Sequence, residues 1–208
     1  SWFDKNDGNI HWVYIGRCGP DMQRSISGLM KAFRTALDRS PDQFSKVRMH
    51  FIGTDYAPPG KERFWVRPYA ERCGVAAYVH EHPLRIGYFE ALKCLLDADA
   101  IVVPGSEDPT YTASKIYPLI AARKPLLTVF DERSSVNNVM RETEAGVAVT
   151  FNDADSDSDV ADKILSKWLL NGSYHIRPKL NEDGFAPYTS RAMTKTLAQV
   201  LEAACTPR

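Results

Sequence analysis

Segments that predict strands alternate strictly with segments that predict helices from residue 10 to residue 170, and this order limits the possible folds more than any other feature. Runs of apolar, β-branched and aromatic residues predict strands at 10–16, 46–53, 76–82, 100–105, 125–130 and 146–151. Apolar residues at helical spacing predict helices at 21–40, 60–74, 87–99, 112–124, 134–146 and 157–170. Such alternation with short links is typical of an α/β domain, in which a doubly wound parallel sheet carries helices on both faces.

The spacing of apolar residues also assigns an inner face to each predicted helix. In the helix at 87–99, the apolar residues Phe89, Leu92, Leu95 and Leu96 recur at helical intervals. We therefore expect all four side chains to face the sheet.

The C-terminal part departs from the alternation. Residues 171–187 contain Gly, Pro and Asn residues that predict a loop, and a last helix is expected at 190–204. That helix carries an apolar stripe, and we expect part of the stripe to pack on the domain, because a fully exposed stripe would promote aggregation. The stripe consists of Met193, Leu197, Val200 and Leu201. We treat 1–208 as one domain, in which 171–208 form this loop and helix.

The composition argues against several classes of function. The 26 basic side chains balance the 26 acidic ones, which argues against a general nucleic-acid binder. No apolar run approaches the roughly 18 residues of a transmembrane segment. Cys18, Cys73, Cys94 and Cys205 form no zinc motif, so we expect reduced thiols, no metal site and a cytoplasmic protein. Because the chain begins without Met, we also expect it to be part of a longer protein.

The acidic run NDADSDSD, at 152–159, invites a calcium-binding interpretation. It lacks the central glycine and the distal glutamate of an EF-hand loop. We therefore expect a solvated turn that caps the following helix.

Two loops at the predicted carboxyl edge of the sheet favour ligand binding, because ligands of open parallel sheets bind at that edge. The first loop follows the first strand. Its Gly16 and Gly19 permit close approach of a ligand to the backbone, and Arg17 could make a bidentate contact with a phosphate. The spacing is neither a dinucleotide-binding fingerprint nor a Walker loop. The alternative is an ordinary turn, with Asp21 as the N-cap of the next helix.

The second loop follows the fourth strand and combines hydroxyl groups with charged side chains. Its candidate ligand-binding residues are Glu107, Asp108, Thr110, Tyr111, Ser114, Lys115 and Tyr117. With Thr112 as the expected N-cap, Lys115 would lie in the first helical turn and oppose the helix dipole, a cost that a bound anion would offset. The alternative is a surface lysine beside solvated loop acids. Together, the two loops favour a nucleoside diphosphate.

Two longer segments carry a resemblance to a known family. They are IGYFEALKCLLDADAIVVPGS, at 86–106, and SKIYPLIAARKPLL, at 114–127. With the order of the other segments, over about 10–151 and the terminal helix, they resemble the C-terminal donor-binding domain of GT-B glycosyltransferases, in particular the family-4-like group (glycosyl transferases group 1). The resemblance implies a Rossmann-like domain that binds a nucleotide-diphosphate sugar in a cleft against a second, N-terminal acceptor domain.

The resemblance also implies where the donor would lie. Carried over by position, the residues near the diphosphate and ribose would be Gly16, Arg17, Ser114 and Lys115, those beside the base Arg85 and Ile86, and those approaching the sugar 107–111. It implies no metal and no cofactor, since cationic side chains would stabilise the leaving diphosphate. Catalytic residues stay unassigned, because the acceptor site and any general base lie mostly in the N-terminal domain. Peripheral membrane association would also depend on that domain.

The sequence departs from the family pattern at three positions. Many members have a Glu-x7-Glu pair whose second glutamate holds the ribose hydroxyls. The corresponding residues here are Thr110 and Pro118, and Arg123 stands where a glycine is usual. Ribose recognition would then depend on Glu107 or Asp108.

Pro118 also constrains the helix expected at 112–124. A proline inside a helix removes a backbone hydrogen bond and presses on the preceding turn. We expect either a kink at this residue or a helix that begins near Ser114, with the proline in its first turn.

The expected function is therefore that of a glycosyltransferase donor domain in polysaccharide biosynthesis. It would bind a UDP-, GDP- or TDP-sugar for transfer to an acceptor hydroxyl, and it would be inactive in isolation. One alternative is a degenerate, non-catalytic nucleotide-binding or scaffold domain. Another is a different Rossmann-like protein, such as an NAD-dependent enzyme or a non-hydrolysing UDP-sugar epimerase. The absence of a GxGxxG motif weighs against NAD.

Overall fold

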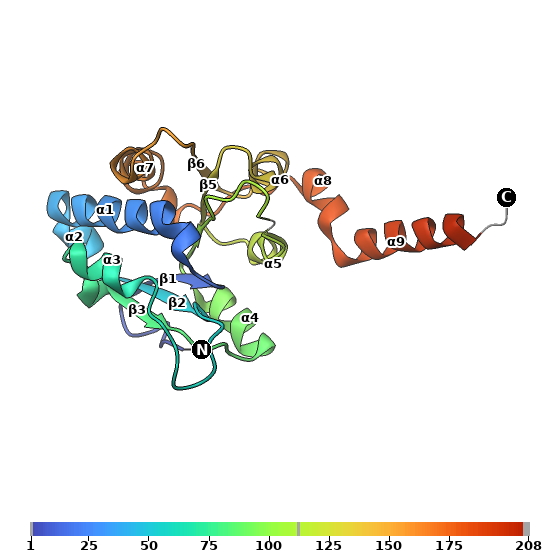
Figure 1. Cartoon of the computed structure of the whole chain (residues 1–208). Coiled ribbons are helices and arrows are strands. Elements are labelled where there is room, and N and C mark those ends of the chain that lie inside the picture. Colours follow the sequence, from blue (N-terminus) through green and yellow to red (C-terminus); the bar gives the residue numbers. More distant parts are fainter. Residues whose placement is uncertain (1, 112, 206–208) are drawn as a thin grey trace.

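The computed structural model describes residues 2–111 and 113–205 and confirms the α/β fold. Six parallel strands form one sheet in the order β3-β2-β1-β4-β5-β6 (Figure 1). The strands are β1 (Ile10–Ile15), β2 (Val47–Ile52), β3 (Val79–His82), β4 (Ala100–Pro104), β5 (Leu126–Asp131) and β6 (Val147–Phe151). Between β3 and β4 the chain crosses from one edge of the sheet to the far side of β1. The loops after β1 and β4 therefore start side by side, where ligands of such sheets bind.

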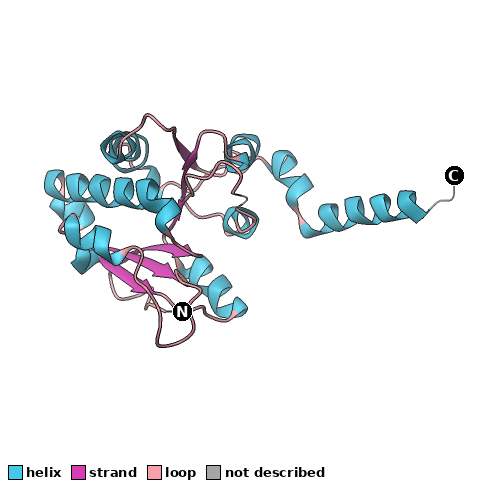
Figure 2. Cartoon of the chain, viewed as in Figure 1, coloured by secondary structure: helices cyan, strands magenta, loops and turns pink. Residues whose placement is uncertain are grey.

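Helices cover both faces of the sheet (Figure 2). One face carries α1 (Gln23–Arg39), α2 (Pro41–Phe44), α3 (Arg67–Arg72) and α7 (Asp157–Ile164), the last continued by a π-helical turn at Leu165–Leu169. The other face carries α4 (Tyr88–Asp97), α5 (Ile116–Ala121) and α6 (Ser135–Thr143). The short helix α8 (Glu182–Phe185) and the terminal helix α9 (Ser190–Cys205) follow.

Large aromatic side chains fill the core between the sheet and α1. Trp12 on β1 packs edge-on against Phe33 of α1 and against Trp168 of the π-helical turn, and all three are buried. Helix α1 also lies close to α7, because a Cβ atom at Gly28 would come within 2.6 Å of Val160. Burial of this apolar surface on the sheet is the main force that holds the layers together.

Two boundaries next to the sheet differ from the predicted ones. The helix expected at 60–74 is only α3, because Glu81 on β3 accepts hydrogen bonds from the backbone N–H groups of Trp65, Val66 and Arg67 at 2.8 to 3.0 Å and so caps a later start. The strand expected from residue 76 begins at Val79, after a 3₁₀ turn. A tertiary contact decides the first boundary, and the local spacing of apolar residues carries no sign of it.

The predicted inner face of α4 is wrong in part. Phe89 is 82% exposed and Leu96 is 62% exposed, whereas Cys94 and Leu95 are buried. Two overlapping stripes fit the helical spacing in this segment, and the sheet meets the one that contains Cys94, Leu95 and, just past the helix, Ala98. Periodicity alone could not choose between them.

Helix α5 begins at Ile116, so Pro118 is its third residue. This agrees with the late start expected as one of two options, since a proline in the first turn removes no intrahelical hydrogen bond. Thr112, the expected N-cap, lies outside the described residues. The acidic run caps a helix as predicted: Ser156 and Asp159 form a capping box at the start of α7.

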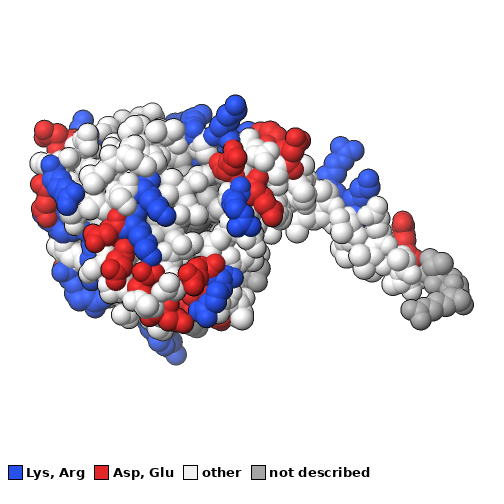
Figure 3. All heavy atoms as spheres, turned by 90° about the horizontal axis from the view of Figure 1, so that it is seen from above, with Lys and Arg blue, Asp and Glu red and all other residues white. Residues whose placement is uncertain are grey.

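The expectation that part of the C-terminal stripe packs on the domain is wrong. Helix α9 has no buried residue and projects as an arm (190–205) from the rest of the domain, which we call the body. Most of the surface of this arm is uncharged (Figures 1 and 3). Short turns join it to the body, where Asn181 donates its backbone N–H to Thr143 and Tyr188 donates to Glu142. In the described part of the chain, the helices fall short of the length and apolar character that crossing a membrane would require.

Candidate functional site

A cavity of about 410 Å³ opens at the carboxyl edge of the sheet, where the first strands meet α4 and α5. The residues that line it come from the ends of β1 and β2, from the links that follow β2 and β3, and from both helices. They are Ile15, Gly16, Ile52, Gly53, Tyr56, Arg85, Ile86, Tyr88, Ala91, Leu92, Leu95, Lys115, Pro118 and Leu119. Gly16, Arg85, Ile86 and Lys115 were predicted from the sequence, and the fold brings them together from three distant segments.

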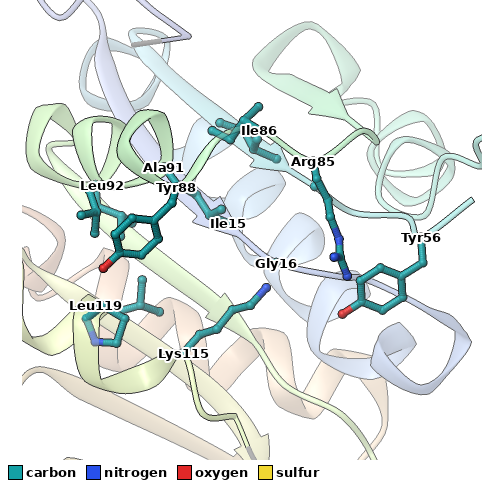
Figure 4. A pocket seen from close by; sticks show the side chains of 14 residues that line it. Ile15, Gly16, Tyr56, Arg85, Ile86, Tyr88, Ala91, Leu92, Lys115 and Leu119 are labelled. Carbon is teal, nitrogen blue, oxygen red and sulfur yellow. The ribbon is translucent and has the colours of Figure 1, made fainter. Parts of the chain in front are cut away.

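Two cations meet at this cavity. Lys115, just before α5, extends toward the backbone of Gly16, and Arg85, between β3 and α4, extends toward Tyr56 (Figure 4). The Arg85 guanidinium lies 4.3 Å from the centre of the Tyr56 ring, a cation–π contact that holds it at the cavity. Among the described residues that line the cavity, no carboxylate offsets these two charges. The site therefore favours an anionic ligand.

The loop after β1 is held in place by polar contacts. The hydroxyl of Tyr14 donates to the carbonyl of Arg17 at 2.7 Å. The Arg17 guanidinium donates to both carboxylate oxygens of Asp21, at 2.9 and 2.6 Å, and Ser106 donates to the same carboxylate at 2.7 Å. The bonds from Arg17 keep the pKa of Asp21 below its usual range and raise that of Arg17.

These contacts change the interpretation of two residues. Asp21 is not the N-cap of α1, since that helix begins at Gln23 without a side-chain cap. Arg17 is an ion-paired residue that is a quarter exposed, with Tyr111 stacked 5.1 Å below its guanidinium. It reaches a ligand only with its charge already partly balanced by Asp21.

A second cavity, of about 270 Å³, adjoins the first and is lined by Arg17, Tyr111, Ser114 and Lys115 together with apolar residues of β1 and β4. Ile15, Tyr56, Lys115 and Leu119 line both cavities. Five predicted residues of the two loops thus lie along one continuous depression: Gly16, Arg17, Tyr111, Ser114 and Lys115.

Other predicted site residues are turned elsewhere. Glu107 accepts a hydrogen bond from the backbone of Arg24 at 3.2 Å and pairs with its guanidinium at 3.3 Å. Asp108 accepts from the backbone and hydroxyl of Thr110, at 2.8 and 2.7 Å, and these bonds lower its pKa.

Tyr117 and Gly19 also lie outside the two cavities. Tyr117 stacks on Tyr188, with ring centres 5.1 Å apart, on the side of the linker to α9. Gly19 lies against the Arg17–Asp21 pair, where a Cβ atom would come within 2.8 Å of both side chains. It makes room for that pair, and its φ of −173° is one that any residue adopts.

Sequence reasoning missed two tyrosines of the site, Tyr56 and Tyr88. They are 58% and 70% exposed and flank the cavity from opposite sides (Figure 4). Each follows the carboxyl end of a predicted strand within a few residues, and this position is the signal that could have found them.

The sheet order defines a Rossmann-like domain, and its carboxyl edge carries a cavity lined by two cationic side chains. No family model matches the sequence, and no curated protein matches it significantly. Solved structures do match over nearly the whole chain. The UDP-forming α,α-trehalose-phosphate synthase from Burkholderia vietnamiensis superposes with a TM-score of 0.62 at 14% identity, over 97% of this chain and 46% of that one.

Two further matches have the same fold. Anabaena HepE, in complex with UDP and glucose, matches with a TM-score of 0.63 at 13% identity, over 94% of this chain and 49% of that one. WaaG, a glycosyltransferase involved in lipopolysaccharide biosynthesis, matches with a TM-score of 0.55 at 16% identity, over 96% of this chain and 46% of that one. The protein therefore has the fold of one half of a GT-B glycosyltransferase, as the sequence predicted, and spans about half the length of these structures.

Proposed function

We propose that this chain is the donor-binding domain of a glycosyltransferase, which binds a nucleotide-diphosphate sugar for transfer to an acceptor hydroxyl. The observation that carries the proposal is the cavity at the carboxyl edge of the sheet, which Lys115, Arg85 and the backbone of Gly16 line together. A diphosphate there would meet two positive charges and a glycine that permits close approach. The fold neighbours support the proposal, since one of them holds UDP and glucose and another is named as UDP-forming.

The chemistry assigned to this chain is electrostatic. As the bond from the sugar to the diphosphate breaks, negative charge grows on the leaving phosphate, and preorganised cations stabilise that charge. Lys115 is the principal group for this role, since the charge of Arg17 is shared with Asp21. We propose that no metal is required. The acceptor site and any general base would belong to a second, N-terminal domain, and the reaction would draw on cytoplasmic nucleotide sugars.

The test is nucleotide binding by three variants. Lys115→Ala should weaken the binding of UDP by about tenfold or more and leave uridine binding unchanged, because a charged hydrogen bond contributes about 1.5–3 kcal/mol. Arg17→Ala should weaken the binding of UDP less than Lys115→Ala does, because the ion pair with Asp21 already balances part of the charge of Arg17. Lys195→Ala, on the exposed arm, is the matched control and should change nothing.

The outcomes separate the alternatives. NMR titration with UDP, GDP, TDP and NAD measures weak binding by this chain. Binding of a diphosphate without NAD supports the donor domain, and binding of NAD supports the dinucleotide enzyme. Silence with every nucleotide supports the scaffold alternative, and equal losses of UDP and uridine affinity in Lys115→Ala would contradict the phosphate assignment.

A further inference from the structure

The apolar wall beside Lys115 and Arg85 bears on which pentose the nucleotide carries. In the first turn of α5, immediately after Lys115, Pro118 and Leu119 line the cavity, and Leu92 and Leu95 of α4 line it opposite. A nucleotide whose phosphates lie between Lys115 and Arg85 must place its pentose within a few bonds of them. The pentose would therefore lie against this wall.

Four carboxylates near the cavity already have hydrogen-bond or ion-pair partners within the protein. Asp21 is held by Arg17 and Ser106, and Glu107 by Arg24. Glu81 accepts from three backbone N–H groups and from Thr54, and Asp55 accepts from the backbone of Tyr56 and Arg63. Turning any of them toward a ligand would break at least two polar contacts, which for Glu107 are one hydrogen bond and one ion pair with Arg24. Among the described residues, the side chains that line the cavity include neither a carboxylate nor a carboxamide to receive a vicinal diol.

We propose that the cavity selects a 2′-deoxyribonucleoside diphosphate, such as the nucleotide part of a TDP-sugar, over its ribonucleotide counterpart. This inference rests on the proposed function and narrows its substrate class. The pentose of a deoxynucleotide presents a CH₂ group at the 2′ position, which suits a wall of proline and leucine carbon. A ribose would place its 2′-hydroxyl against that wall, where loss of water without a new hydrogen bond would weaken binding by about tenfold.

The matched pair UDP and dUDP isolates the single hydroxyl. NMR titration of this chain should give a dissociation constant for dUDP about tenfold lower than for UDP. Equal affinities, or tighter binding of UDP, would overturn the deoxy-selection and leave the donor-domain function standing. Absence of binding by both nucleotides would overturn the proposed function and this inference with it.

Pro118 offers a gain-of-function test. Pro118→Glu adds a carboxylate on the cavity wall at the third residue of α5, where an acidic side chain suits the helix dipole and the fold should persist. The variant should shift the preference toward UDP by about tenfold. Pro118→Ala, which removes the ring and adds no acceptor, should keep the preference for dUDP. If Pro118→Glu and Pro118→Ala show the same ratio of dissociation constants while both bind nucleotide, the pentose does not lie against this wall and the inference fails.

Discussion

Helices α1 and α9 have nearly the same length, 17 and 16 residues, and both carry an apolar stripe, but only α1 is buried. Leu29 of α1 is 1% exposed, whereas Leu197 and Leu201 of α9 are 58% and 56% exposed. The comparison shows that a periodic pattern determines that a helix forms and which face is apolar. The surface that covers this face comes from the rest of the fold, and for α9 the described part of the chain supplies none.

The largest expected effect on stability tests this comparison with one leucine from each helix. Leu29→Ala should lower the free energy of unfolding by about 2–5 kcal/mol, because it leaves a cavity between α1 and the sheet. Leu197→Ala should change it by less than about 0.5 kcal/mol, because the side chain already faces solvent. Urea denaturation of both variants and of the parent chain measures the difference. Similar losses in the two variants would mean that α9 is packed in solution.

The body of the fold follows from local pattern, which is why the sequence predicted it well. The central strands β1, β4 and β5 are largely buried and read as mainly apolar runs, and short links leave little freedom in the topology. Errors arose where a distant contact decides the outcome. Glu81 shortens α3 from across a loop, and the sheet chooses one of two stripes on α4.

The candidate site was predictable only in part. Topology indicated that the loops with Gly16 and Lys115 meet, and the family resemblance placed Arg85 beside them; all three residues line one cavity at the edge of the sheet. The partners of charged side chains were not predictable, because ion pairs such as Glu107 with Arg24 join residues 83 positions apart. The sequence placed Glu107 and Asp108 at the ligand site together with Lys115, and only the folded geometry separates them.

The body and the arm should also differ in how acid affects their stability, because only the body contains a buried histidine. His50 on β2 is buried beside His11 and His80, at a ring nitrogen distance of 2.9 Å from His11, with Phe3 stacked on it and with Asp7 and Arg48 nearby. Burial, and then the charges of its neighbours His80 and His11, lower the pKa of His50 from 6.5 to about 3. His50 therefore stays neutral in the folded body across the mildly acidic range.

The sign of the pH effect follows from that pKa. The unfolded chain binds a proton at His50 near pH 6.5 and the folded chain only near pH 3, so acid favours unfolding. The free energy of unfolding should fall by up to about 1.4 kcal/mol per pH unit below pH 6.5 and level off near pH 3. His50→Gln, which can still pair with His11, should flatten this slope in urea titrations from pH 7 to 4. An unchanged slope would assign the acid sensitivity to other groups.

The smallest expected effect comes from removing the arm. A chain that ends at Thr189 loses α9, whose residues bury nothing, so its free energy of unfolding should stay within about 0.5 kcal/mol of the parent value. It should also show less self-association, because four exposed apolar side chains are removed: Met193, Leu197, Val200 and Leu201.

An apolar groove of about 520 Å³ lies next to the base of the arm, between α4, α5 and Tyr188. A loss of more than about 1 kcal/mol on truncation would mean that α9 folds back into that groove, and the contrast between α1 and α9 would then be one of degree. Sedimentation together with urea denaturation of the truncated chain distinguishes these results.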